Sequence, residues 1–227
     1  MSPNANPNFA KYISRGGDKL AAALDAFMIS VEGLTCADFG SHVGGFVDCL
    51  LQRGASKVYS VDTSYGTLAW KLRKDPRVIV MERTNAMHVA LPEPVDLVTI
   101  DVGWTTQAKV LPNVRQIIKS SGRVVSLIKP HYEAPRESLM KGVLPDEACN
   151  GVLGTVLADA QECQFEVLAI TASPIRGHGG NREFFAQLIP VVTSVPNSRF
   201  DLEDQVVAAT RAANAACKEN SGFGVNP

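Results

Sequence analysis

The stretch Cys36-Ala37-Asp38-Phe39-Gly40-Ser41-His42-Val43-Gly44-Gly45-Phe46 decides the fold of this chain. Apolar residues lead into it, glycines interrupt it, and a second apolar run follows it, which predicts a buried strand, a tight turn and a helix. Glycine tolerates positive φ and has no Cβ, so such a turn lets the backbone approach a ligand closely. The stretch therefore predicts a site for a nucleotide-type cofactor.

A second expected strand brings an acid to this turn. The run 57–62 is apolar and ends in Asp62, and a carboxylate at that place accepts ribose hydroxyls in nucleoside sites. Asp38 precedes the first glycine, where it would repel a pyrophosphate but suit a cofactor with a cationic amino group, such as S-adenosylmethionine. Two alternatives remain open: Asp38 satisfies amides of the turn, or the site serves a nicotinamide-dependent dehydrogenase.

Length and composition favour one α/β domain, since the chain has 227 residues of which 45% are hydrophobic. The net charge is −1, so local patches must recognise any nucleic acid. The five cysteines form no C-x-x-C motif, which argues against disulfides or a metal site and fits the reducing cytoplasm. Residues 1–10 predict a flexible N-terminal tail, and no apolar run predicts a signal peptide or a membrane span.

Strand and helix signals alternate from residue 34, which predicts a mainly parallel seven-stranded sheet with helices on both faces and right-handed crossovers. The expected strands are 34–39, 57–61, 77–81, 95–100, 122–128, 165–172 and 183–189. The expected helices are 44–53, 65–73, 107–119 and 146–163, after a first helix that Gly16-Gly17 separates from the preceding chain and that carries Lys19 in its first turn. The segment 201–218 predicts an amphipathic helix that packs on the sheet or supports a dimer.

Charged residues stand at the ends of three expected strands. Asp101 follows 95–100, Lys129 follows 122–128, and Glu183 opens the last strand. Ligands of such sheets bind outside the carboxyl ends of the strands, so these side chains are candidates for chemistry, with Glu183 expected beside Lys129. The alternative is that each is an ordinary strand-end charge or belongs to a structural ion pair.

Five motifs, in this order, resemble the TlyA branch of the FtsJ-like RNA 2′-O-methyltransferases. They are 12–20 (Tyr-Ile-Ser-Arg-Gly-Gly-Asp-Lys-Leu), the turn 38–46, 81–86 (Met-Glu-Arg-Thr-Asn-Ala), 128–130 (Ile-Lys-Pro) and 180–184 (Gly-Asn-Arg-Glu-Phe). The resemblance covers residues 11–190 and implies a Rossmann-like, S-adenosylmethionine-dependent methyltransferase domain there. Residues 191–227 then form a C-terminal helical extension and tail.

The resemblance also implies roles for single residues. Matching the catalytic tetrad of the family are Lys19, Asp101, Lys129 and Glu183. The residues expected to bind S-adenosylmethionine are Asp38, Gly40, Ser41, Gly44, Gly45, Phe46, Asp62 at the ribose, Asn85 near the adenine, and Asp101. No metal is expected.

The implied partner is RNA, with rRNA or a ribosomal subunit favoured, and neither DNA nor a membrane. The sequence departs from the family at two places: no small ribosomal-protein-like RNA-binding domain is found before residue 11, and Val102-Gly103-Trp104 replaces the usual Val-Ser-Phe. A recruiting partner or a homodimer is therefore expected. Candidate RNA contacts are Lys11, Arg15, Lys19, Arg136, Lys141, Tyr132 and Trp104, although solvated charges and packed rings would give the same pattern.

Methyl transfer to a ribose hydroxyl needs an oriented nucleophile that also loses its proton. Lys129 either abstracts that proton with the help of neighbouring Lys19, or stays charged and orients the hydroxyl while carboxylates take the proton. The sequence leaves both interpretations open. Rival functions are a non-catalytic module that binds S-adenosylmethionine and RNA and, ranked last, a haemolysin-like protein, since no membrane-inserting segment is found.

Overall fold

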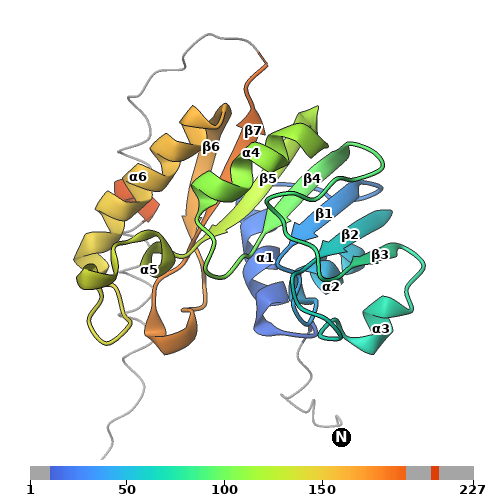
Figure 1. Cartoon of the computed structure of the whole chain (residues 1–227), viewed down its shortest axis with the longest axis horizontal. Helices are drawn as coiled ribbons and strands as arrows, with labels where there is room; N and C mark the ends of the chain where they lie inside the picture. The colour runs from blue at the N-terminus through green and yellow to red at the C-terminus, as the bar shows by residue number, and fades with distance from the viewer. Residues whose placement is uncertain (1–10, 193–205, 210–227) are drawn as a thin grey trace, which may run out of the picture.

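The computed structural model describes residues 11–192 and 206–209. They form a seven-stranded sheet in the order β3-β2-β1-β4-β5-β7-β6 (Figure 1). The strands are β1 (Thr35–Phe39), β2 (Lys57–Val61), β3 (Val78–Met81), β4 (Val95–Ile100), β5 (Ile118–Ile128), β6 (Phe165–Ala172) and β7 (Phe184–Pro190). Strand β7 is antiparallel to both of its neighbours, and the other pairs are parallel. The predicted mainly parallel sheet is confirmed.

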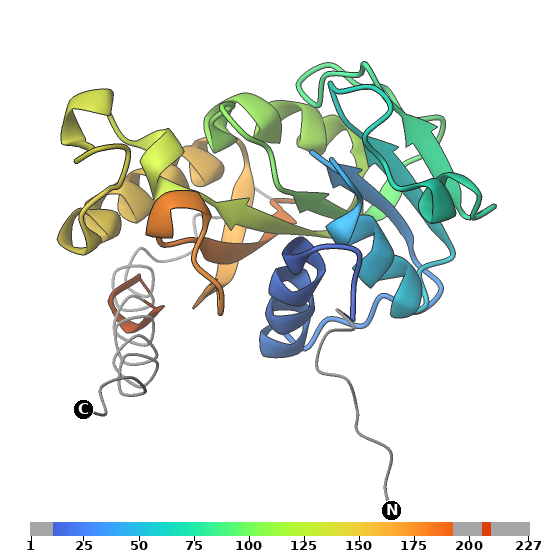
Figure 2. The ribbon, with the colours of Figure 1, turned by 90° about the horizontal axis from the view of Figure 1, so that it is seen from below.

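Helices cover both faces of the sheet. They are α1 (Arg15–Ala26), α2 (Gly45–Gln52), α3 (Trp70–Arg73), α4 (Gln107–Ile117), α5 (Pro130–Glu133) and α6 (Cys149–Glu162), with 3-10 turns η1 (Arg136–Ser138), η2 (Asp146–Ala148) and η3 (His178–Gly180). One buried cluster joins the sheet to α4 and α6, and the other joins it to α1 and α2 (Figure 2). Leu97 and Val98 of β4 alternate between the two clusters, so this strand is buried on both faces.

The start of α1 differs from its prediction. Gly16 and Gly17 lie inside the first turn of this helix instead of breaking the chain before it, because Ser14 is the N-cap and its Oγ accepts the amide of Gly16. Lys19 consequently lies in the second turn of the helix and not in the first, as was predicted. Small residues are needed here because a Cβ on Gly17 would overlap the side chain of Tyr12.

Two further helix boundaries were predicted wrongly. The helix expected at 65–73 is reduced to α3, because Asp62 accepts the amide of Ser64 and Gly66 adopts φ +76°, which favours a loop after β2. The helix expected at 107–119 ends at Ile117, and β5 begins at the next residue, four positions before the strand expected at 122. The remaining elements deviate by up to three residues.

Little of the predicted C-terminal helix can be described. Residues 206–209 are helical, and Val206 and Ala209 are buried in the same cluster as α4 and α6. The rest of 201–218, the expected tail 1–10 and the end of the chain lie outside the described residues. The contacts of Val206 and Ala209 agree with a helix that packs on the domain.

The contact between α1 and α2 generates the first testable prediction. A Cβ on Gly45 would overlap Ser14 Oγ and lie 3.0 Å from the backbone nitrogen of Gly17, so G45A must separate the two helices. We expect G45A to lower the free energy of unfolding by about 1–3 kcal/mol, measured by urea denaturation. The matched control is G154A in α6, where a Cβ meets nothing within 4 Å. Equal stability of the two variants would contradict the close helix contact.

Candidate active site

The turn after β1 lies directly on the backbone that follows β4. Gly40 has φ +87°, and a Cβ there would overlap the carbonyl oxygen of Asp101. The amide of Asp101 donates to the carbonyl of Phe39 at 2.8 Å. A side chain at position 40 would therefore both strain the turn and displace Asp101.

A pocket of about 240 Å³ opens where the N-termini of α1 and α2 meet the ends of β1 and β4. From the α1 side it is lined by Ser14, Arg15, Gly16 and Lys19. The turn contributes Gly40, Ser41, His42, Val43, Gly45 and Phe46, and Asp101 closes the wall. Two helix N-termini and a lysine favour a negatively charged group, such as the carboxylate of an amino-acid moiety.

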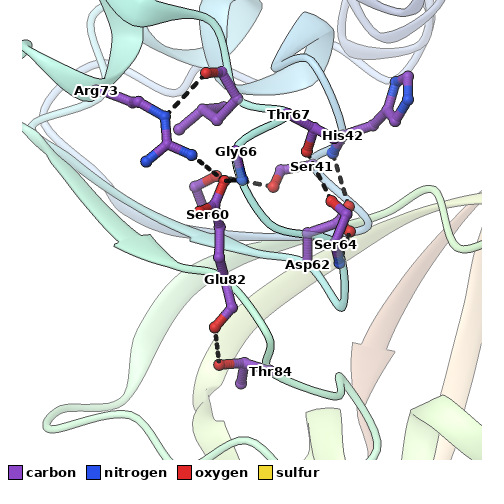
Figure 3. Close-up of polar contacts among 11 residues, drawn as sticks. Ser41, His42, Ser60, Asp62, Ser64, Gly66, Thr67, Arg73, Glu82 and Thr84 are labelled. Atoms are coloured by element: carbon purple, nitrogen blue, oxygen red, sulfur yellow. Dashed lines mark hydrogen bonds and ion pairs between the residues drawn. The ribbon is translucent and has the colours of Figure 1, made fainter.

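Asp62 is held at the edge of this turn as a hydrogen-bond acceptor. Its Oδ2 accepts the amide of His42 and its Oδ1 accepts the amide of Ser64, both at 2.7 Å (Figure 3). Burial raises its pKa, but the bonds from Ser64 and His42 outweigh burial, so the pKa lies below the ordinary value for Asp. An ionised carboxylate offers about four acceptor sites, so capacity for ribose hydroxyls remains.

A network of polar contacts fixes the loops around Asp62 (Figure 3). Ser60 Oγ donates to Ser41 Oγ at 2.8 Å, which joins β2 to the glycine turn. Glu82 accepts the amide of Gly66 at 3.0 Å and pairs with Arg73, so it joins the loop after β2, helix α3 and the turn after β3. Asn85 lies just beyond this turn, where its Oδ1 accepts the amide of Met87.

Asp38 occupies a different environment from Asp62. It is fully buried, it accepts a 2.6 Å hydrogen bond from Thr99, and its Oδ2 has no hydrogen-bond partner among the described residues. Burial raises its pKa to about 8, while the bond from Thr99 acts against this and the charges of Asp101 and Asp62 add to it. Asp38 is not among the residues that line the pocket, so its contact with a cofactor stays a prediction.

The four residues matched to the tetrad form two ion pairs. Lys19 Nζ lies 2.5 Å from Glu183 Oε2, and Lys129 Nζ lies 2.6 Å from Asp101 Oδ1 and 3.0 Å from the carbonyl oxygen of Val102. Lys19 and Asp101 line the pocket, so one member of each pair faces the same space. Glu183 was expected beside Lys129. The neighbouring pair Ile128–Phe184 confirms that β5 and β7 are adjacent, but the carboxylate turns to Lys19.

Sequence patterns missed the contacts that hold Glu183. A Cβ on Gly177 would overlap the Glu183 carboxylate, so a glycine is required where the loop crosses it. The preceding residues bind the segment 142–146: Asn181 accepts the amide of Leu144 and donates to the carbonyl of Gly142, and Arg182 lies 2.8 Å from Asp146. The glycines and polar residues of 176–182 carry a loop signal, but not the identity of these distant partners.

A tilted pair of aromatic rings adjoins Lys129. The rings of Trp104 and Tyr132 are 4.8 Å apart, and Lys129 Nζ lies 5.7 Å from the centre of the Tyr132 ring. Trp104 is 82% exposed, so its ring is available to a base. Of the candidate cations, Arg15 lines the pocket, Lys11 lies over the Tyr12 ring, and Arg136 and Lys141 are exposed.

The structure therefore divides the predicted cofactor residues. Those that line the pocket are Gly40, Ser41, Gly45, Phe46 and Asp101. Gly44, with φ +100°, instead packs against Leu68 and Leu72, which its missing side chain makes possible. The glycine cradle, the two helix N-termini and the ionised Asp62 fit the amino-acid and ribose parts of S-adenosylmethionine. Within 11–192 and 206–209, no three His, Cys, Asp or Glu side chains are grouped to hold a metal.

The order of the strands, the glycine turn after β1 and the acid Asp62 after β2 are together typical of the class of S-adenosylmethionine-dependent methyltransferases. One such enzyme, from Mesorhizobium loti, matches with a TM-score of 0.58 at 19% identity, over 76% of this chain and 99% of that one, which is a likeness of fold. The sequence profile of the FtsJ-like methyltransferases matches residues 12–189, and the chain belongs to this family. Membership confirms the predicted fold, the enzyme class and S-adenosylmethionine as cofactor.

Similar proteins carry two kinds of name. The 16S/23S rRNA (cytidine-2′-O)-methyltransferase TlyA of Mycobacterium tuberculosis is 40% identical over 183 residues, which are 78% of this chain and 68% of that protein. A protein of Streptococcus thermophilus described as a hemolysin has a TM-score of 0.86 at 35% identity, over 95% of this chain and 79% of that one. No helix in the described part of this chain is long and apolar enough to cross a membrane.

The environment of Asp62 yields a prediction for cofactor affinity. If its free acceptor sites bind ribose hydroxyls, D62A should weaken S-adenosylhomocysteine binding about tenfold or more, since bonds to a charged group are lost. Asp96 gives a matched control, because it also accepts a backbone amide, that of Thr35, but at the opposite end of the sheet. Calorimetry should show unchanged binding for D96A and weak NAD binding by all three proteins; tighter NAD than S-adenosylhomocysteine binding would refute the assignment.

Proposed function

We propose that this chain methylates the 2′-hydroxyl of a ribose in RNA. The proposal rests on the observation that Lys19 and Asp101, one from each ion pair, face a single pocket beside the glycine turn. The relative from M. tuberculosis, which is named for cytidine-2′-O methylation of rRNA, supports rRNA as the substrate class. We assign this activity to residues 11–190, with 191–227 as an extension outside the catalytic unit.

Bound S-adenosylmethionine supplies a methyl group on a sulfonium, an electrophile that needs no further activation. The turn at Gly40 and Ser41, with Asp62 at the ribose, would hold it. The protein must then bring the 2′-oxygen into line with the methyl carbon and handle its proton. The carbon–sulfur bond breaks as the oxygen–carbon bond forms, and the hydroxyl proton leaves to a carboxylate or to water.

Lys129 is the residue that we assign to the 2′-oxygen. An ammonium group has three donors; Lys129 bonds the carbonyl of Val102 with one of them and forms an ion pair with Asp101, so donor capacity for a hydroxyl remains. Asp101 Oδ1 lies 2.6 Å from the Lys129 ammonium, and the two groups form an ion pair. These contacts favour orientation of the hydroxyl by a cation, with Asp101 as the nearby acceptor for the proton, over abstraction by a neutral amine.

Lys19 is the second cation that we assign to this oxygen, with Glu183 as its ion-pair partner. The Glu183 side chain is 4% exposed and lies against Gly177, so it fixes Lys19 in one direction. Lys19 then stabilises negative charge that develops on the oxygen. RNA would meet Arg15 at the pocket, Arg136 and Lys141 further out, and the ring pair of Trp104 and Tyr132 at the base.

Substitution of Lys129 tests the proposed chemistry. K129A should lower methyl transfer to RNA by orders of magnitude while S-adenosylhomocysteine affinity stays within about twofold, because the group acts mainly in the transition state. K129R keeps charge and donors but cannot act as a base, so residual activity in it indicates orientation by a cation. The assay combines labelled S-adenosylmethionine with fractionated cellular RNA, followed by mapping of the methylated ribose.

The matched control is K57A. Lys57 also pairs with an acid, Glu93 at 2.6 Å, and lies 5.9 Å from a tyrosine ring, that of Tyr59, but it is remote from the pocket. We expect K57A to retain activity. Normal turnover of K129A would refute the tetrad, and cofactor binding by the unaltered protein without turnover on any RNA fraction would favour the non-catalytic module.

RNA affinity gives a second prediction for this function. Many basic side chains are already paired with acids, such as Arg53 with Asp25 and Lys119 with Asp96, and the net charge of the chain is −1. We therefore expect weak RNA binding that depends strongly on salt between 50 and 200 mM, with a slope of log affinity against log salt that is proportional to the number of phosphates contacted. Fluorescence anisotropy measures this, and nanomolar affinity of the monomer at physiological salt would contradict it.

A further inference from the structure

Two short segments next to the pocket are joined at three successive points. Lys129 contacts Asp101 and Val102, the Tyr132 ring packs on Trp104, and Glu133 Oε1 accepts the amide of Gln107 at 2.9 Å. One segment is 129–133, which contains α5, and the other is 101–107, which links β4 to α4. We call this pairing the clasp. The contact of Lys129 with Asp101 belongs to the proposed tetrad. The contact of Glu133 with Gln107 lies four residues further along the first segment and six residues further along the second.

We infer that Glu133 is a positioning residue, which closes the far end of the clasp and thereby fixes Asp101 and Lys129 for methyl transfer. The inference rests on the proposed function, because it assigns Glu133 a part in the same reaction. The carboxylate of Glu133 is bonded to the backbone amide of Gln107 at the start of α4, so it acts through the loop and not on the substrate.

The loop 101–107 ends at a helix start that takes its hydrogen-bond acceptor from Glu133. Thr106, the N-cap of α4, makes no capping hydrogen bond with its own side chain, so Glu133 supplies the acceptor for the first turn of the helix from another element. Gln107 is buried, and its Oε1 accepts a 2.6 Å bond from Ser126. Ser126 is the β5 partner of Ile100, the residue before Asp101. Both ends of the loop 101–107 are thus fixed to the neighbouring strands β4 and β5.

The strength of the clasp depends on the charge of Glu133. Burial raises its pKa to about 7, the bond from Gln107 acts against this, and the charge of Asp159 on α6 adds to it. The other charged groups nearby are Lys129 and Asp101 in the first contact and His131, whose pKa is lowered by burial and by Lys129. Above pH 7 the carboxylate bonds the amide strongly and complements the helix dipole; below it the neutral acid does so weakly.

Stability and activity consequently depend on pH in opposite directions. The pKa of Glu133 is higher in the folded protein than in the unfolded chain, so its contribution to stability is complete below pH 4.5 and is lost as pH rises through 7. The clasp, in contrast, tightens over the upper part of that range. A role in stability alone would leave the kcat of the folded protein unchanged as Glu133 ionises, whereas the positioning role predicts that kcat rises near pH 7.

The first test uses no RNA. The chain has two tryptophans, so W70F leaves Trp104 as the single reporter on the clasp. We expect its emission to change with a midpoint near pH 7 in W70F, to lose that transition in W70F/E133Q, and to keep it in W70F/H131N. D159N removes a charge that raises the pKa of Glu133, so the midpoint should move to lower pH. An unchanged transition in W70F/E133Q would overturn the inference.

The second test measures the reaction. E133Q keeps the shape of the side chain but not its charge, so kcat should fall about tenfold above pH 8 and lose its rise near pH 7. The KM for S-adenosylmethionine should stay within about twofold, as expected for a residue outside the pocket. A kcat–pH profile of E133Q that parallels the unaltered protein would refute the positioning role. If the unaltered protein methylates no RNA, the proposed function fails, while the Trp104 titration still decides whether the clasp exists.

Discussion

The close approach of Gly40 to the backbone of Asp101 is the constraint on which the site depends. It brings the turn after β1 into contact with the end of β4, so the backbone of the expected cofactor cradle lies directly against the backbone of one acid of the tetrad. Gly45 applies the same principle between α1 and α2, because its missing side chain lets the helix that carries Lys19 lie against the helix that follows the turn. Absent side chains thus place Lys19 and Asp101 on one pocket.

Two acids near this turn show how environment assigns roles to the same functional group. Asp62 accepts backbone amides at the edge of the sheet and has a lowered pKa, which suits it to accept hydroxyls. Asp38 is fully buried, with one hydrogen-bonded oxygen and a pKa raised to about 8. A carboxyl that is largely neutral at pH 7 is a poor receiver for a cationic amino group, unless binding of that cation restores its charge. The sequence alone could not separate the two cases.

Periodicity and motif order predicted what local sequence controls. Apolar runs of strand length predicted the seven strands, and the order of five motifs predicted the family. Both signals come from residues that are neighbours in the sequence. The errors arose where distant groups decide. Gly16 and Gly17 are helical because Ser14 caps them and α2 packs on them, and 65–69 is a loop because Asp62 binds Ser64. The ion pair of Glu183 with Lys19 was likewise not predicted, because the pairing of strands does not show where a side chain of helix α1 lies.

Neutralisation of the lysines connects the ion pairs to the proposed reaction. The sulfonium group of the cofactor is a cation, so two ammonium groups without acidic partners would repel it. This repulsion becomes stronger as the distance between the charges becomes shorter. Asp101 and Glu183, at 2.6 and 2.5 Å from their lysines, make the set of four neutral overall. Each lysine therefore keeps its hydrogen-bond donors without adding net positive charge to the pocket. Removal of either acid would leave a net positive charge that repels the sulfonium, whereas removal of Lys129 would leave a net negative charge that does not. Loss of an acid should therefore weaken cofactor binding, which four independent and fully solvated charges would not do.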